Sequence, residues 1–160
     1  MVQLASQIVL SEIDVELTLL GSLFAAPDSF GELAGDISAS WFSDPIARYM
    51  FEECAKLQAE GHTLATPVVI SMLPEDCGGG LTRGAFYARV RGAGMPMEQV
   101  GGLIATLKDR WARRELLAAA DALKSTASLF GNDPFVLAQD TVLSLDTINA
   151  SRAGKAIGTL

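Results

Sequence analysis

The sequence predicts an all-α fold, because apolar residues recur at helical spacing along most of the chain and no segment shows the alternation of a β-strand. Between Met97 and Phe130 there is no internal proline, and two apolar stripes with three- and four-residue spacing follow one another. Upstream, cap-plus-proline pairs such as Asp44-Pro45 mark the starts of shorter helices. These observations predict a compact head of about five helices, followed by a long helix and an antiparallel helical hairpin.

The head is expected over residues 11–95, after an N-terminal arm at residues 1–10. Its first helix carries one apolar face, made of Ile13, Leu17, Leu20 and Phe24. Gly21 lies inside this helix at a cost of about 1 kcal/mol relative to alanine, which predicts a close helix–helix crossing at that point. Pro27 is expected to end the helix, and Asp28 to cap a second one.

The remaining head helices are predicted from caps, prolines and glycines. Asp44 and Pro45 start a third helix that runs to about residue 60, and Thr66 is expected to cap a short fourth helix before Pro67. A fifth helix is expected over residues 82–91. Trp41 and Phe42 are interpreted as head core, and residues 74–80 as a flexible loop.

Residues 96–150 are expected to form the long helix and the hairpin, the predicted dimerisation element, and residues 151–160 a flexible tail or linker start. The second apolar stripe begins one residue out of step with the first: Val100, Ile104, Leu107 and Trp111, then Ala112, Leu116, Ala119, Leu123, Ala127 and Phe130. Gly131 stops the long helix, and Asp133 caps a return helix that starts at Pro134. That helix carries one apolar face, made of Phe135, Ala138, Val142, Leu145 and Ile148.

Two helices cannot cover both stripes, so either the N-terminal half of this chain or another copy of it covers the hairpin. We favour self-association, because the head has enough apolar residues to close its own core. The residues predicted to form the self-association seam are Leu116, Ala119, Leu123, Phe130, Val142 and Leu145. Tyr87, Leu117 and Leu123 are the candidates for contact with a different partner, because exposed apolar and aromatic anchors dominate interface energetics.

Composition narrows the class of protein. The 160 residues are 49% apolar and carry a net charge of −7, which argues against strong contact with nucleic acid. No apolar run approaches the roughly 18 residues of a membrane span, and no signal peptide is recognisable. Cys54 and Cys77 form no disulfide framework, so we expect a cytoplasmic protein without membrane contact.

No catalytic, metal-binding or cofactor-binding residue is predicted. The glycines of residues 78–80 lack the preceding strand and following lysine of a phosphate-binding loop. Cys54, His62 and Cys77 do not have the number or spacing of a structural zinc site. A small enzyme that uses Cys77 or His62 is kept as a hypothesis of another class, with no substrate indicated.

Five segments, in this order and spacing, resemble the N-terminal domain of DnaB-type replicative DNA helicases. They are Val15-Glu16-Leu17-Thr18-Leu19-Leu20-Gly21, Trp41-Phe42-Ser43-Asp44-Pro45, Glu60-Gly61 with Val68-Val69, Gly84-Ala85-Phe86-Tyr87, and Lys108-Asp109-Arg110-Trp111-Ala112-Arg113-Arg114-Glu115-Leu116-Leu117. The resemblance covers residues 11–150. Ala47, Ala65 and Arg83 stand where the family has His, Asp and Gly, which suggests a diverged member of the kind carried by phages, plasmids or prophages.

The resemblance implies a head-plus-hairpin domain whose hairpins pair between subunits, as a dimer or as a trimer of dimers in a hexamer. It also implies a non-catalytic role in assembly and docking, with primase or a helicase loader as partner. Full-length members are ATP-dependent helicases, but no motor motif occurs in these 160 residues, so ATP hydrolysis is not expected of this chain. The alternative is a free-standing module that regulates a host replicative helicase.

Overall fold

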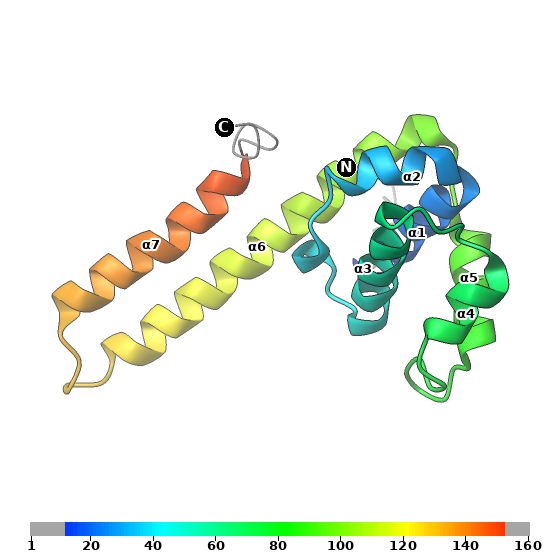
Figure 1. Cartoon of the computed structure of the whole chain (residues 1–160). Coiled ribbons are helices and arrows are strands. Elements are labelled where there is room, and N and C mark those ends of the chain that lie inside the picture. The colour runs from blue at the N-terminus through cyan, green and yellow to red at the C-terminus, as the bar shows by residue number, and fades with distance from the viewer. Residues whose placement is uncertain (1–11, 153–160) are drawn as a thin grey trace, which may run out of the picture. The chain divides into compact units, whose positions relative to one another are not determined.

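The computed structural model describes residues 12–152, and within them the fold is all-α, as predicted (Figure 1). The only bridge outside helices there joins Asp76 and Thr82. The elements are α1 (Glu12–Ala25), α2 (Pro27–Ala34), η1 (Ala39–Trp41), α3 (Pro45–Ala59), α4 (Thr66–Met72), α5 (Arg83–Ala93), η2 (Met97–Gln99), α6 (Val100–Ala127) and α7 (Pro134–Arg152). The predicted arm and most of the predicted tail lie outside the described residues.

The chain divides into two compact units, residues 1–108 and residues 109–160. The boundary falls inside α6. The first unit therefore holds not only the predicted head but also η2 and the beginning of α6, which the sequence pattern had assigned to the hairpin element.

The starts of the head helices follow local capping chemistry, with three differences from prediction. The first is that Asp28 does not cap α2: it lies inside the helix, whose N-cap residue is Ala26 and has no side-chain hydrogen bond. Asp44 caps α3 as expected, because its Oδ2 accepts a hydrogen bond from the Ala47 amide at 2.8 Å. Pro27, by contrast, begins α2 instead of ending α1, since its fixed φ suits a first helical position. Thr66 is the first residue of α4 and does not cap it; its hydroxyl lies 3.1 Å from the hydroxyl of Tyr87.

An aromatic cluster forms the centre of the first unit. The ring of Phe51 in α3 stacks on Phe42 at 5.1 Å and on Phe30 of α2 at 6.1 Å, centroid to centroid. Trp41 and Phe42 are buried, as predicted. Lys108, early in α6, places its ammonium group 5.5 Å from the centre of the Trp41 ring. The first unit thus closes its own apolar core.

The predicted close crossing at Gly21 is confirmed. α1 packs mainly on α5, and a Cβ atom on Gly21 would lie 2.1 Å from the carbonyl oxygen of Val90 and 2.7 Å from the amide nitrogen of Gly94. Next to this crossing, the buried Ser22 hydroxyl accepts a hydrogen bond from the Met95 amide at 2.8 Å. Glycine at both positions lets α1 and the end of α5 approach at backbone distance.

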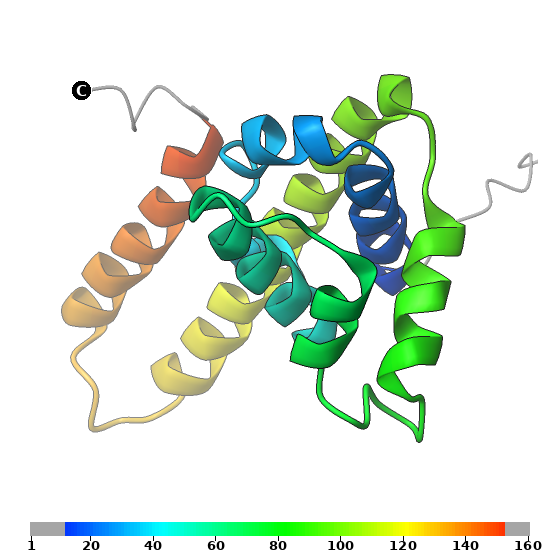
Figure 2. The same ribbon diagram turned by 45° about the vertical axis from the view of Figure 1, so that its right-hand side comes forward.

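The second unit consists of the C-terminal part of α6, a turn and α7. Figures 1 and 2 show α7 running back beside this part of α6. α6 ends at Ala127, not at the predicted Phe130, because the turn begins earlier: the side-chain amide of Asn132 donates to the Thr126 carbonyl at 3.0 Å. Asp133 caps α7 as predicted, its Oδ1 accepting from the Phe135 amide at 2.9 Å.

Candidate protein-interaction surface

The second unit leaves its apolar side chains uncovered. After Trp111, no residue up to Arg152 is buried. The exposed large apolar side chains of α6, the turn and α7 are Leu116, Leu117, Leu123, Leu129, Phe130, Phe135, Val136, Val142, Leu143 and Leu145. We call this set the second-unit apolar surface. Large apolar side chains that gather on the exposed faces of one pair of helices are typical of an interaction site.

Nearly all the residues predicted for the self-association seam belong to this surface. Leu116, Leu123, Phe130, Val142 and Leu145 are exposed, and Ala119 is half-buried. Their exposure leaves them free to meet another protein. That they contact a second copy stays a prediction.

The three residues predicted to contact a different partner differ clearly in their exposure to solvent. Leu117 is 67% exposed and Leu123 is 37% exposed. Tyr87 is only 7% exposed, because its ring packs edge-on against Phe24 at 6.1 Å and its hydroxyl meets that of Thr66. Tyr87 is therefore a residue of the first-unit core and is not part of the candidate surface.

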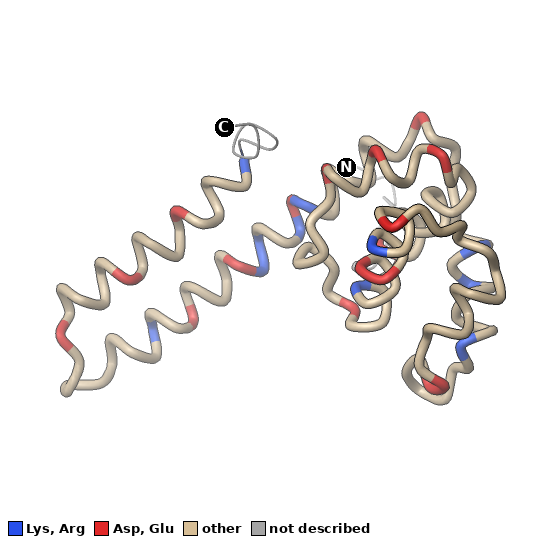
Figure 3. The backbone as a smooth tube through the Cα atoms, in the orientation of Figure 1, with Lys and Arg blue, Asp and Glu red and all other residues tan. Residues whose placement is uncertain are grey.

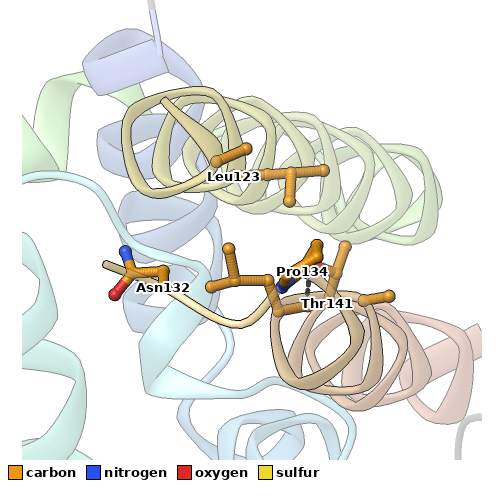
Figure 4. Close-up of a pocket in the computed structure, with 7 residues that line it drawn as sticks. Leu123, Asn132, Pro134 and Thr141 are labelled. Atoms are coloured by element: carbon orange, nitrogen blue, oxygen red, sulfur yellow. Dashed lines mark hydrogen bonds between the residues drawn. The ribbon is translucent and has the colours of Figure 1, made fainter. Parts of the chain in front are cut away.

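A pocket of about 330 Å³ opens between α6 and α7 near the turn (Figure 4). Leu123 and Ala127 contribute from α6, Asn132 from the turn, and Pro134, Leu137, Ala138 and Thr141 from α7. Its lining is mostly apolar. Pattern analysis alone did not indicate this pocket, because it depends on how far apart the two helices lie at the turn.

Charge is unevenly distributed along the second unit (Figure 3). Arg110, Arg113 and Arg114 gather at the start of its α6 part, where Arg113 donates to Asp109 at 2.8 Å on an exposed face. Between Lys124 and Arg152 there is no basic residue. An exposed ion pair one helical turn apart contributes little to stability. Arg113 is exposed, whereas Arg110 and Arg114 are half-buried.

The head contains one polar residue that the sequence reading missed. Glu16 in α1 is fully buried, and its carboxylate accepts hydrogen bonds from the amides of Ser43 and Asp44 and from the Ser43 hydroxyl. It therefore ties α1 to the segment that starts α3. Glu16 lies three residues after Ile13 and four before Leu20, so helical spacing places it on the apolar face of α1. This spacing could have predicted its burial from the sequence.

The two thiols lie in surroundings that oppose nucleophilic chemistry. Burial raises the pKa of Cys54 to about 12, and burial also raises the pKa of Cys77. Both shifts disfavour the reactive thiolate. Within residues 12–152, no group of three His, Cys, Asp or Glu side chains is placed to hold a metal ion.

The glycine loop after α4 contains several internal hydrogen bonds. The Asp76 carboxylate accepts from the amides of Gly78 and Gly80 at 2.8 and 3.3 Å, and the Cys77 amide donates to Leu81. Gly78, Gly79 and Gly80 all have positive φ, which only glycine adopts without strain. This loop is a tight hydrogen-bonded turn.

No protein-family model matches the chain, and no curated protein matches it. None of the helices in the described part of the chain is long and apolar enough to cross a membrane.

Proposed function

We propose that this chain is a non-catalytic assembly and docking domain of a replicative DNA helicase, working in the cytoplasm. The observation that carries the proposal is the second-unit apolar surface, on a segment without a buried residue after Trp111. The resemblance of five ordered segments to DnaB-type N-terminal domains supplies the class of protein. The raised pKa values of both cysteines favour this proposal over an enzyme that uses Cys77.

In this proposal α6 and α7 form a helical hairpin that pairs with the hairpin of a second copy. Apolar surface excluded from water is the main driving force of such association. Paired hairpins set the arrangement of subunits, as a dimer or as a trimer of dimers. A partner that binds one arrangement of subunits more tightly than another shifts the population toward the arrangement it prefers. The size of the shift is set by the difference between the two affinities.

Primase or a helicase loader is the proposed docking partner, and Leu117 is the proposed anchor for it. Leu117 is 67% exposed and lies about 100° around α6 from Leu116. It therefore presents a different face from the seam residues Leu116 and Leu123. A surface used for self-association and a surface used for docking can coexist on one helix when they point in different directions.

Equilibrium sedimentation of this chain between about 1 and 100 µM tests the assembly half of the proposal. We expect a mass that rises to that of a dimer or a higher closed species as concentration increases. A monomer at every concentration, with α6 and α7 folded by circular dichroism, contradicts it.

Titration of Leu117→Asp with the primase of the same replication system tests the docking half. We expect the affinity for primase to fall about 30-fold while the sedimentation profile is unchanged, because one apolar anchor outside the seam is lost. Lys124→Glu, an exposed change on the same helix, is the matched control. Equal affinity of the two variants contradicts a docking role for Leu117.

A further inference from the structure

The pocket between α6 and α7 is built for an apolar occupant. The two polar side chains in its lining each donate one hydrogen bond within this chain: the Thr141 hydroxyl donates to the Leu137 carbonyl at 2.7 Å, and the Asn132 side-chain amide donates to the Thr126 carbonyl at 3.0 Å. The remaining lining side chains are Leu, Ala and Pro. Most of the lining therefore offers no hydrogen-bond partner to a polar ligand, whereas a hydrocarbon group needs none.

Two phenylalanines flank this pocket in sequence and are the most exposed large apolar side chains among the described residues. Phe130, in the turn, is 108% exposed, and Phe135, in the first turn of α7, is 84% exposed. We call them the tip aromatic pair. Phe130 lies three residues after the lining residue Ala127, and Phe135 directly follows the lining residue Pro134, so the exposed rings and the open pocket belong to the same end of the second unit.

We propose that the tip aromatic pair of a second copy of this chain fills the α6–α7 pocket, and that the exchange is reciprocal about a two-fold axis at the turn. This inference rests on the proposed self-association and specifies its contact. In an isologous pair, each copy inserts its aromatic side chains and receives those of its partner, so one surface supplies both halves of the contact.

The area available fits a second copy. A phenylalanine buries roughly 150–250 Å², so the rings of both copies bury about 600–1,000 Å² together. The rest of the second-unit apolar surface, which runs along the same two helices, is available to extend the contact. Stable protein interfaces bury about 1,200–2,000 Å² in total, and the rings together with the neighbouring leucines and valines reach that range.

The test uses two variants: one removes the aromatic side chains that insert, and the other blocks the pocket that receives them. Phe130→Ala with Phe135→Ala removes the aromatic side chains and leaves the pocket open. Ala138→Phe fills the pocket from within and leaves the tip aromatic pair intact. Lys124→Ala, a truncation of an exposed side chain of α6 outside the second-unit apolar surface, is the matched control, and circular dichroism checks that every variant keeps its helices.

We expect each variant alone to raise the dissociation constant of the dimer about 100-fold, because central aromatic anchors dominate interface energetics. Lys124→Ala is expected to change this dissociation constant less than about threefold. When the two variants are mixed, the open pocket of the first receives the aromatic side chains of the second. One of the two contacts is restored, so the mixed dimer is expected to form about tenfold more tightly than either variant alone.

The outcomes separate this inference from the proposed function. Wild-type affinity in both variants, or a mixture that binds no better than its components, overturns the reciprocal exchange and leaves self-association standing. A species that keeps growing with concentration overturns the two-fold closure. A wild-type chain that stays monomeric overturns both.

Discussion

The two units of this molecule differ in the burial of their apolar side chains. In the first unit, α1 is buried along most of its length, and the rings of Phe30, Phe42 and Phe51 pack on one another. In the second unit, nothing after Trp111 is buried, although leucine and valine recur at the same helical spacing. Helical periodicity therefore identifies which side chains share a face, but it does not say what covers that face.

The first unit closes because its backbone segments approach very closely and its buried polar groups are satisfied. Gly21 and Gly94 allow the closest approach, and Ser22 and Glu16 bond to the segments that follow α5 and precede α3. In the described part of the second unit, side-chain hydrogen bonds link groups within one helix, as from Thr141 to Leu137, and close the turn, as from Asn132 to Thr126. The first unit is therefore stabilised from within, whereas the large apolar side chains of the second unit stay exposed.

The largest expected effect breaks the first unit at its closest crossing. Gly21→Ala places a Cβ atom 2.1 Å from the Val90 carbonyl oxygen, so the two segments have to separate. We expect the free energy of unfolding to fall by about 3 kcal/mol, measured by urea denaturation. Gly84→Ala is the control: it meets open space in α5, and removal of a helical glycine is expected to stabilise by about 0.5–1 kcal/mol. A Gly21→Ala chain as stable as the Gly84→Ala chain would refute the crossing.

The second prediction separates the units. Leu123→Asp puts an unpaired charge at the proposed seam, and we expect it to raise the dimer dissociation constant about 100-fold by sedimentation. The near-ultraviolet circular dichroism and melting of the first-unit aromatic cluster should not change. Lys124→Glu, at the adjacent exposed position, is expected to alter association less than about threefold. If Leu123→Asp melts both units together, the second unit is ordinary core of a single fold.

The third prediction concerns the buried carboxylate. Glu16→Ala leaves the amides of Ser43 and Asp44 without their acceptor, and we expect it to lower the free energy of unfolding by about 2 kcal/mol. Glu16→Gln keeps one acceptor oxygen and should recover part of this loss. Glu32→Ala, on the exposed face of α2, is the matched control and should change stability by less than about 0.5 kcal/mol. Equal stability of the Glu16→Ala and Glu32→Ala chains would count against the role given to Glu16.

The smallest expected effect is a pH dependence from Cys54. Burial raises the thiol pKa from 9.0 to about 12, so above pH 9 the unfolded chain loses this proton and the folded chain keeps it. Stability from this group is complete below pH 9 and declines as pH rises toward 12. Between pH 8 and pH 10 we expect a loss of about 1.4 kcal/mol, measured by urea denaturation, that is absent in Cys54→Ala. The same pH slope in both proteins would contradict the burial of this thiol.

Much of the fold was predictable because it depends on local chemistry. The Asp44 and Asp133 caps and the spacing of apolar residues each act within one or two helical turns. The errors also have local causes. Pro27 begins a helix as readily as it ends one, and Thr66 forms a hydrogen bond with a distant tyrosine instead of capping α4.

The candidate site was predicted in part. The apolar residues of the second unit follow from spacing, so Leu117 and Leu123 were identified. Tyr87 was not correctly placed, because an amphipathic tyrosine suits a core and an interface equally well, and only the position of Phe24 decides between them. The pocket lined by Leu123, Pro134 and Thr141 was out of reach, since it depends on the separation of two helices at a turn.

Hydrogen–deuterium exchange at two protein concentrations tests most directly whether a second copy covers the second unit. Amides of α6 beyond Trp111 and of α7 should be protected at about 100 µM and should exchange much faster at about 1 µM. Amides of α1, α3 and α5 should exchange at the same rate at both concentrations. Protection of α7 that is independent of concentration would contradict the account, because the cover would then come from within the chain.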